Sequence, residues 1–521
     1  LIHSQSQHQP SYSELMSQVD REGDESRVVA EKWFQNRRRS LLAPFAVGTI
    51  DQAMLSVLPT KHHFVRQFGL SHRVVIFDEI HAYDTFMNQI IERLLHWLNG
   101  LNAPAILLSA TLPSSTKSRL LAQVGATETV SQVPYPRLTV VEADGQVKRH
   151  SLPSPPAFEL QVDWLTTENL AEWLRPIYDR GGCIAIVCNT VDAAIDTARA
   201  LRSSIGIDSD DVMLLHARMP FAWRDHAEAQ VLAFFGKDSQ RPERKILVAT
   251  QIIEQSLDID FDLMITSVAP IDLIIQRAGR LHRHKRTRPE HLQTPTIIIR
   301  EPETFDDDIP DFGVDSLIYN EYPLLRTWQV LKQRPSIRIP DDMDELIEAV
   351  YVDTNIHRDH TQDPLQQALA DAHDDLMMHD HRQGFRGKQF RIAEISDENL
   401  IGFMGCELPD DERIITTRDM QPGVEIVCLT NSEVFDLPAD IQRRPTKAEV
   451  TKLLQYRLTI RKQSLIDHLL ALPAYPSWRY ESALRDTKPI VFDSDTFTIP
   501  GSDYFLRISP FYGLEMVKNN E

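Results

Sequence analysis

The chain has 521 residues, which is too long for a single hydrophobic core, so two to four domains are expected. Its formal net charge of -20 excludes a surface coated with basic groups, although a local basic groove for nucleic acid is compatible with that average. Four scattered cysteines exclude a disulfide framework, and no apolar run is long enough for a membrane span, so we expect a cytoplasmic protein without a membrane partner.

Two short apolar runs near the start of the chain each end in polar residues. Residues 74–77 are followed by Asp78 and Glu79, and residues 106–108 are followed by Ser109 and Thr111. Ligands collect at the carboxyl ends of the strands in open α/β sheets, where an acidic residue can hold the magnesium ion that bridges two phosphates. These two runs therefore predict a nucleotide-hydrolysing site.

A helix is expected directly after the acidic pair. Asp84 or Thr85 can cap its first turn, and Gly100 marks its end. Its apolar residues recur on one face, as in a helix that packs on a core. They are Phe86, Ile90, Leu94 and Leu98.

A proline-rich segment, residues 152–156, predicts a linker to a second α/β domain. Buried strands separated by helical segments follow it, which implies a parallel sheet with right-handed crossovers. Asn189 and Thr190 can cap the helix after the first of these strands. The expected strands are residues 183–187, 212–215, 246–249, 263–268 and 296–299.

A string of arginines lies between the last two expected strands of the second domain. Residues 276–283 read Gln-Arg-Ala-Gly-Arg-Leu-His-Arg, and residues 277–288 carry six lysines and arginines with no acid. An arginine-rich helix is usually a solvated face, but here it predicts that positive charge is segregated from the acidic remainder. That charge is suited to a triphosphate.

The sequence beyond residue 300 is less informative. An acidic, proline-containing stretch around residues 306–308 suggests an exposed connector, and residues 340–395 are mainly polar and helical. Short alternating runs then suggest a small mixed domain. They are residues 413–417, 424–429, 496–499 and 505–508.

Histidines and aspartates are concentrated between residues 357 and 381, which raises the question of a metal site. A metal cluster needs a rigid, supported set of ligands, whereas this segment is hydrophilic with few apolar anchors. We therefore interpret it as a solvated linker or helix face, with adventitious metal binding as the alternative. Its residues are His357, Asp359, His360, His373, Asp374, His379, Asp380 and His381.

Taken singly, the acidic pair, the Ser-Ala-Thr triplet and the arginine string each have an ordinary structural explanation. Together they occur in the order and rough spacing of superfamily 2 helicases. In closer wording the chain resembles the CRISPR-associated helicase-nuclease of type I systems, densely over residues 46–284 and only in general layout elsewhere. The segments that carry the resemblance are residues 48–52, 78–84, 107–113, 248–258 and 276–284.

The resemblance implies a domain organisation. Residues 1–155 would form a first RecA-like domain that is incomplete at its N-terminal side, and residues 156–300 a second RecA-like domain. Residues 301–395 would be a partly helical linker, and residues 396–521 a C-terminal accessory domain. The expected fold class is therefore α/β, with two parallel-sheet helicase domains and a small mixed domain.

The resemblance also implies roles at an ATP site, on the pattern of phosphoryl transfer. Asp78 would hold Mg²⁺ and Glu79 would polarise the attacking water, while His81, beside Ser109 and Thr111, would couple nucleotide state to domain position. Positive charge at the γ-phosphate would come from Arg280 and Arg283, reaching across from the second domain. Further nucleotide contacts are expected from Gln276, Gly279 and Asp258. Contacts to single-stranded DNA are expected from Thr49, Gln52, Asn189, Thr190, Arg218 and Gln251.

Two parts of such a protein are missing from the sequence. No Gly-x-x-x-x-Gly-Lys-Ser/Thr phosphate loop occurs, because Gly236-Lys237 and Gly387-Lys388 lack the earlier glycine and are followed by aspartate and glutamine. The nuclease domain is also missing. The sequence begins at Leu1, so we expect a C-terminal portion of a larger protein that hydrolyses no ATP by itself.

The functional expectation is an ATP-dependent DNA helicase of the 3'-to-5' type, which the CRISPR surveillance complex (Cascade) recruits to unwind target DNA for degradation. The alternative is a non-catalytic remnant that only binds nucleic acid or that complex. An RNA helicase of the same superfamily is disfavoured by the wording of residues 78–84. A neighbouring gene for the phosphate loop and the nuclease would favour the enzyme.

Overall fold

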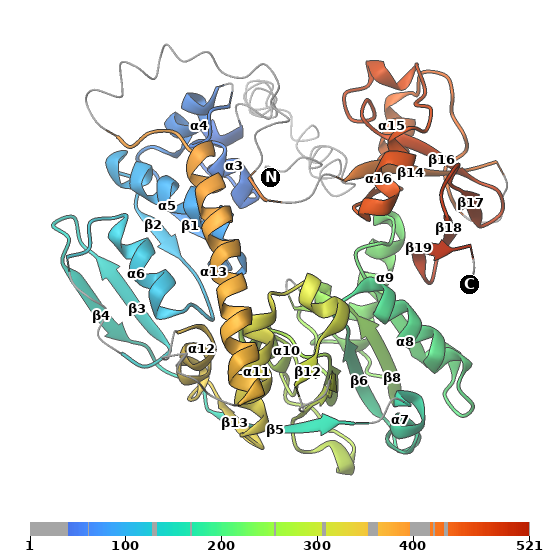
Figure 1. Ribbon diagram of the computed structural model, residues 1–521, viewed down its shortest axis with the longest axis horizontal. Coiled ribbons are helices and arrows are strands. Elements are labelled where there is room, and N and C mark those ends of the chain that lie inside the picture. Colours follow the sequence, from blue (N-terminus) through green and yellow to red (C-terminus); the bar gives the residue numbers. More distant parts are fainter. Residues whose placement is uncertain are drawn as a thin grey trace, which may run out of the picture. The chain divides into compact units, whose positions relative to one another are not determined.

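The computed structural model divides into two compact units (Figure 1). The first contains Leu1–Pro156, Met343–Ile356 and Ala370–Met420, and the second contains Ala157–Asp342, His357–Leu369 and Gln421–Glu521. In the part of the chain that the structure describes, no helix combines the length and apolar character that a membrane span needs. The described residues are 40–60, 62–127, 133–166, 169–254, 257–304, 309–352, 363–395, 417–419, 423–431 and 436–519.

The first unit is built around two parallel strands, β1 (Val75–Phe77) and β2 (Ala105–Leu107), with Val75 opposite Ala105 and Phe77 opposite Leu107. An antiparallel hairpin, β3 with β4, follows them. The other elements of the unit are η2 (Ser40–Leu42), α3 (Ile50–Met54), α4 (His63–Leu70), η3 (Ile80–Ala82), α5 (Thr85–Gly100), α6 (Ser114–Ala122), β3 (Arg137–Val141), β4 (Val147–Ser151), α12 (Met343–Tyr351) and most of α13 (Pro364–Phe390).

Helix α5 forms as the sequence predicts. The Asp84 side chain accepts a hydrogen bond of 2.8 Å from the Met87 amide at its first turn. Its four predicted apolar residues are all buried and belong to the core of the first unit. The cap and the apolar stripe together fix which face of α5 covers the two strands.

One face of the β1–β2 pair remains open among the described residues. Val74 and Ile76 are each 61% exposed, and Ile106 and Leu108 are 43% and 46% exposed. Parallel sheets are normally covered on both faces, so two strands with one apolar face open are a partial sheet.

The second unit contains a seven-stranded sheet in the order β13-β5-β10-β9-β6-β8-β7. All neighbours pair in parallel except β13, which is antiparallel to β5. The strands are β5 (Phe158–Leu165), β6 (Gly182–Val187), β7 (Val212–Leu215), β8 (Arg244–Ala249), β9 (Leu263–Thr266), β10 (Thr296–Arg300) and β13 (Ser336–Ile339).

All five predicted strands of the second sheet are present, but the sheet also contains two that the sequence pattern missed. β5 alternates buried and exposed residues at one side of the sheet, and β13 has only four residues. Both therefore lack the continuous apolar run that marks a central parallel strand. Because β13 follows residue 300, the sheet of the second domain extends into the stretch that was expected to be linker.

Helices cover the sheet of the second unit, and α8 runs beside β7 and β8 (Figure 1). Thr190 caps α8 as predicted, since its side chain accepts a 3.1 Å hydrogen bond from the Ala193 amide. The remaining elements are α7 (Leu170–Asp179), α8 (Val191–Ser203), η4 (Ser209–Asp211), α9 (Phe221–Phe235), η5 (Gln251–Ile253), α10 (Ile271–Ala278), η6 (Glu290–Leu292), β11 (Glu303–Thr304), β12 (Pro310–Asp311), η8 (Gly313–Leu317) and α11 (Glu321–Lys332).

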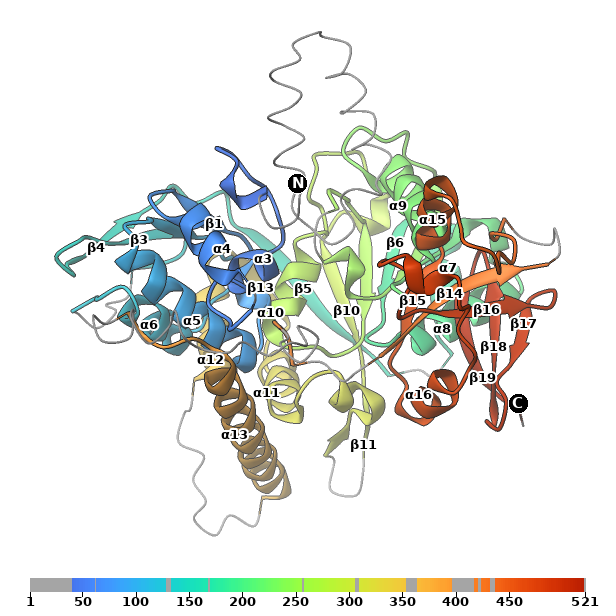
Figure 2. The same ribbon diagram turned by 90° about the horizontal axis from the view of Figure 1, so that it is seen from above.

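The C-terminal part of the second unit is a mixed α/β region, as the alternating runs predict (Figure 2). It has two three-stranded sheets, β15-β14-β16 and β17-β18-β19. Of the predicted run at residues 413–417, residues 413–416 lie outside the described part of the chain. The elements are β14 (Val424–Thr430), α15 (Lys447–Gln455), β15 (Arg457–Ile460), α16 (Gln463–Leu470), η10 (Trp478–Tyr480), β16 (Lys488–Phe492), β17 (Thr496–Thr498), β18 (Tyr504–Ser509) and β19 (Gly513–Lys518).

The turn before β19 docks on the second unit's large sheet through His216. This ring is fully buried, and its Nδ1 accepts a 3.2 Å hydrogen bond from the Arg218 amide while its Nε2 donates to the Tyr512 carbonyl at 3.1 Å. Gly513 has a φ of 65°, and a Cβ there would lie 2.7 Å from the Arg218 carbonyl oxygen. The close approach therefore requires glycine and a neutral imidazole.

The burial of His216 predicts that the contact between the turn before β19 and the large sheet is sensitive to acid. Burial, and then the charge of Arg218, lower the pKa of His216 from 6.5 to about 3. A lowered histidine pKa contributes stability above about pH 6.5 that is lost as the pH falls towards the folded-state value. Urea unfolding of the second unit should therefore lose about 2 kcal/mol more between pH 7 and pH 5 in the wild type than in His216→Gln, whose amide does not titrate. Equal losses in the two proteins would contradict this account.

Candidate functional site

The acidic pair lies where strand β1 ends. Asp78 and Glu79 are exposed, and the Glu79 amide donates a 3.1 Å hydrogen bond to Asp78 Oδ1. Glu79 has a φ of 54°, so the chain turns sharply through the left-handed region before η3. Such a conformation is costly for a residue with a Cβ, and it is often retained at functional sites. The turn leaves both carboxylates open to solvent.

His81 joins the acidic pair to the end of strand β2. Its Nδ1 lies 3.1 Å from Ser109 Oγ, and its Nε2 lies 3.2 Å from Glu79 Oε2. Ser109 Oγ in turn donates to the Thr111 carbonyl at 3.2 Å. The parallel pairing of β1 with β2 brings together these residues, which are about 30 positions apart in sequence. The structure thus groups all five residues that were predicted for the first half of the ATP site.

Two further predicted residues of the first unit lie at the start of helix α3. Thr49 is exposed and occupies the position before the helix, without a side-chain cap bond, and Gln52 is half-buried within its first turn. Between them, Asp51 accepts hydrogen bonds from Thr417, at 2.6 Å, and from Arg418. Thr49 and Gln52 are therefore on one short helix start.

In the second unit, Arg277 on α10 is completely buried. Its Nε donates to Glu254 Oε1 at 2.8 Å, and its Nη1 donates to Thr266 Oγ1 at 2.6 Å. Burial acts to lower the pKa of Arg277, but the Glu254 carboxylate together with Tyr319 and Cys188 raises it. Arg280 Nη2 donates to the Glu254 carbonyl oxygen at 2.6 Å. Glu254 thereby binds Arg277, in the last turn of α10, and Arg280, just beyond it. Helix α10 is here called the arginine helix.

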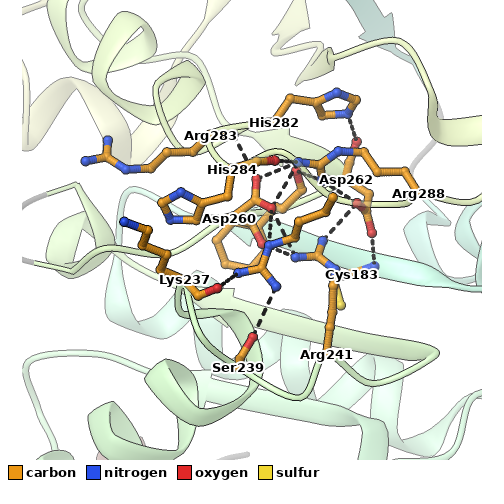
Figure 3. A network of polar contacts seen from close by, with 12 residues as sticks. Cys183, Lys237, Ser239, Arg241, Asp260, Asp262, His282, Arg283, His284 and Arg288 are labelled. Carbon is orange, nitrogen blue, oxygen red and sulfur yellow. Dashed lines mark hydrogen bonds and ion pairs between the residues drawn. The ribbon is translucent and has the colours of Figure 1, made fainter.

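The basic run at residues 277–288 is not a free positive surface, which corrects the expectation of segregated charge. Asp260 and Asp262 are buried and form ion pairs with Arg241 and Arg288, and Asp260 also pairs with Arg286 (Figure 3). Burial acts to raise the pKa of Asp262, but Arg241 and its other donors hold it below the usual range. The acids that neutralise the run lie about 25 residues earlier in sequence.

Main-chain bonds keep these partners in register. The Phe261 amide donates to the Arg280 carbonyl at 2.9 Å, and the His282 amide donates to the Phe261 carbonyl at 3.1 Å. The Arg283 amide donates to Asp260 Oδ1 at 2.8 Å. The segment after α10 is thus pinned along residues 258–262, and the pairing could not be read from charge order alone.

The side chain of Arg283 points to a different acid. It is 42% exposed, and its Nε donates to Asp258 Oδ1 at 2.7 Å, where His284 Nε2 also lies at 3.1 Å. Gln276 is half-buried on α10, and Gly279 ends that helix. The structure therefore brings the five predicted nucleotide-contact residues of the second unit to one end of α10. Gln255 and Ser256, which precede Asp258 in the same motif, are outside the described residues.

The predicted DNA contacts of the second unit follow the carboxyl ends of three neighbouring strands, β6, β8 and β7. Arg218 follows β7 and pairs with Asp192, while Thr190 follows β6 and caps α8. Gln251, after β8, donates from Nε2 to the Asn189 carbonyl oxygen at 2.8 Å. Asn189 is only 3% exposed, so its side chain offers little surface to a ligand.

The histidine- and aspartate-rich segment lies partly outside the described residues, since residues 357–360 are not among them. His373, Asp374, His379, Asp380 and His381 lie on helix α13, where Asp380 accepts a 2.8 Å hydrogen bond from Thr85. Within the described part of the chain, no group of three or more potential ligands could hold a metal ion. The segment is helical where it is described.

Known proteins resemble this chain over most of its length. A family model described as the C-terminal part of the CRISPR-associated nuclease/helicase Cas3 matches residues 180–286. The chain is 34% identical to the Cas3 endonuclease/helicase of Thermus thermophilus, over 90% of this chain and 57% of the relative. It is 30% identical to the Cas3 nuclease/helicase of Streptococcus thermophilus, over 100% and 60%. The chain thus spans about three fifths of the length of these relatives.

Solved structures also match this chain over most of its length. A crystal structure described as "T. fusca Cas3-ATP" matches with a TM-score of 0.81 at 30% identity, over 93% of this chain and 58% of that one. A chain in a "CRISPR RNA-guided surveillance complex, pre-nicking" matches with a TM-score of 0.74 at 30% identity, over 92% and 61%. The two-domain α/β fold and the relatives that share it lead to one conclusion: this chain belongs to the Cas3 helicase family.

Proposed function

We propose that the chain is the motor portion of an ATP-dependent DNA helicase that acts in CRISPR interference. The observation that carries the proposal is the contact of His81 with both Glu79 and Ser109, which links the acidic pair to the end of a second strand. A relative was solved as Cas3-ATP and another within a surveillance complex, and this supports ATP as cofactor and Cascade as partner. Unwinding of target DNA in the 3'-to-5' sense is part of the proposal.

The acidic pair suits Mg²⁺-ATP. Magnesium prefers oxygen ligands and is usually held by one or two carboxylates together with phosphate oxygens. Asp78 would hold the ion and Glu79 would polarise the attacking water. When bound, Mg²⁺-ATP would supply the phosphoryl group whose transfer to water drives movement. His81, with Ser109 and Thr111, would keep Glu79 in place.

In the second unit, Arg280 and Arg283 would supply positive charge to the phosphoryl group in the transition state, with Gln276, Gly279 and Asp258 as further nucleotide contacts. Arg283 is the better placed to change partners, because its ion pair with Asp258 is half-exposed. Exposed pairs contribute only about 0–1 kcal/mol, so a phosphate oxygen can replace Asp258 at little cost.

Contacts to one DNA strand are proposed for Thr49 and Gln52 in the first unit. In the second unit they are proposed for Thr190, Arg218 and Gln251, at the ends of neighbouring strands. Asn189 belongs to the same set, but its burial favours a role in holding its neighbours. Backbone contacts of this kind carry little sequence information, which suits a motor that must move along any DNA.

A non-catalytic remnant remains the second candidate, and one observation favours it. The sequence contains no Gly-x-x-x-x-Gly-Lys-Ser/Thr phosphate loop, which in related ATPases cradles the β- and γ-phosphates. In that case the chain would bind nucleic acid or the surveillance complex without hydrolysing ATP.

Glu79→Gln is the first test of the motor proposal. In a helicase reconstituted from this chain and a phosphate-loop-bearing part, the variant should bind ATP normally and lose hydrolysis, because the amide keeps the shape but cannot polarise water. Glu142→Gln, an exposed change on the hairpin of the same unit, is the matched control. Near-normal turnover by Glu79→Gln would remove Glu79 from this role.

Arg283 gives the second test. Arg283→Ala should lower turnover on the order of a thousandfold with little change in ATP affinity, because its charge is used in the transition state. Arg283→Lys should restore only part of the rate, because lysine lacks the planar fork. Arg175→Ala removes an exposed arginine from another ion pair of the same unit and serves as control. Loss of ATP binding at unchanged turnover would refute the assignment.

The purified chain gives the third test, which asks whether this sequence holds a phosphate site of its own. Without a phosphate loop, Asp78 would face a magnesium ion with no second anchor. Residues 1–521 alone should therefore release no more phosphate with single-stranded DNA than the Glu79→Gln variant does. DNA-stimulated release that Glu79→Gln abolishes would show that a phosphate site exists elsewhere in this sequence.

A further inference from the structure

A short segment after β10 contacts residues at the ends of β6 and β8, two central strands of the large sheet. It comprises η8 and the residues that lead into α11. Asp315 Oδ2 accepts a 2.7 Å hydrogen bond from Asn189 Nδ2, and the Tyr319 hydroxyl accepts a 2.8 Å hydrogen bond from Gln251 Nε2. The segment thus contacts two of the residues proposed above to face DNA, and neither Asp315 nor Tyr319 belongs to a recognised helicase motif in this sequence.

Asn189 is held from every side. Besides Asp315, its Nδ2 donates to the Val268 carbonyl oxygen at 2.7 Å, and its Oδ1 accepts from Arg277 Nη2 at 3.2 Å. Its own carbonyl oxygen accepts from Gln251 Nε2. An amide group has two donors and one acceptor oxygen, and here both donors and the oxygen have partners. Removal of one partner would leave a buried polar group unsatisfied.

The same contacts continue to the arginine helix. Asp315, Asn189, Arg277 and Glu254 form an unbroken chain of hydrogen bonds, with distances of 2.7, 3.2 and 2.8 Å. The Glu254 carbonyl oxygen also holds Arg280. Gln251 and Asn189 are therefore connected to α10 by short polar contacts in a buried region, where such contacts are strong.

The electrostatics of the segment agree with this arrangement. Burial raises the pKa of Asp315, while the Asn189 hydrogen bond and the Arg277 charge act in the opposite direction. Burial raises the pKa of Tyr319 to about 12, so its hydroxyl is neutral at physiological pH and a steady partner for Gln251.

We propose that Asp315 and Tyr319 are positioning residues that hold Asn189 and Gln251 against Arg277, so that the DNA-facing strand ends and the arginine helix of the second unit respond together. The inference rests on the proposed motor function and names a coupling element for it. The coupling would make ATP hydrolysis sensitive to DNA, because a strand bound at Gln251 would stabilise the arrangement that orients Arg280.

Tyr319→Phe tests the proposal, because it removes the acceptor for Gln251 and keeps the ring. The matched control is Tyr178→Phe in the same unit, which loses a 2.6 Å hydrogen bond to Asp211 at the other end of the sheet. The Tyr178 hydroxyl also accepts a 3.2 Å hydrogen bond from the Asp208 amide, so Tyr178→Phe loses two hydroxyl bonds and Tyr319→Phe loses one. A purely structural role therefore predicts an effect of Tyr178→Phe at least as large as that of Tyr319→Phe. A hydrogen bond contributes about 1 kcal/mol, which corresponds to about fivefold.

The measurement is the DNA concentration that gives half-maximal stimulation of ATP hydrolysis by the reconstituted helicase. Tyr319→Phe should raise it about fivefold, whereas Tyr178→Phe should leave it unchanged. In a Gln251→Ala background, Tyr319→Phe should have no further effect, because the two residues act through one contact. Asp315→Ala should also shift the DNA dependence, and Asp315→Asn, which keeps an acceptor for Asn189, should restore it.

Equal shifts in Tyr319→Phe and Tyr178→Phe, or full additivity with Gln251→Ala, would overturn the proposal. If the wild-type helicase showed no DNA-stimulated hydrolysis, the proposed function would fail first. Positioning is then decided by amide hydrogen exchange of the purified chain. Tyr319→Phe should speed exchange at residues 188–191 and 250–254 while Tyr178→Phe does not, and unchanged exchange there would also refute the positioning role.

Discussion

The buried ion pair of Arg277 with Glu254 is the constraint on which the second unit depends. Taking two charges out of water costs several kcal/mol each, and their attraction offsets this cost only when the remaining donors and acceptors are also satisfied. Arg277 meets that condition through Thr266 and Asn189. Strand β9, the end of β6 and helix α10 must therefore keep their relative positions, because a shift of any of them would leave a buried charge with an incomplete set of partners.

A second set of ion pairs explains how an acidic protein can carry an arginine-rich motif. Asp260 and Asp262 neutralise Arg241, Arg286 and Arg288 in the interior, so part of the positive charge after α10 supports the fold (Figure 3). Arg283 differs, because its partner Asp258 is half-exposed and the pair is screened by water. The structure thereby separates arginines with buried ion pairs from Arg283, whose ion pair is partly exposed.

The two units differ in how complete their sheets are. The seven-stranded sheet of the second unit buries its central strands entirely, as β6 shows along its whole length. The β1–β2 pair of the first unit brings the predicted site residues close together but leaves one apolar face open among the described residues.

The sequence by itself determined the central strands, helix α5 with its Asp84 cap, and the grouping of polar residues at strand ends. These depend on local apolar runs, capping side chains and the rule that parallel strands end at the same edge. Tertiary structure decided the edge strand β13 and its neighbour β5, whose short or alternating patterns carry no clear signal. It also decided which acids pair with the basic run and which residues Glu254, Asp315 and Tyr319 contact. Charge pairing depends on which distant segments meet, and that is set by the packing of the whole sheet and not by the order of residues along the chain.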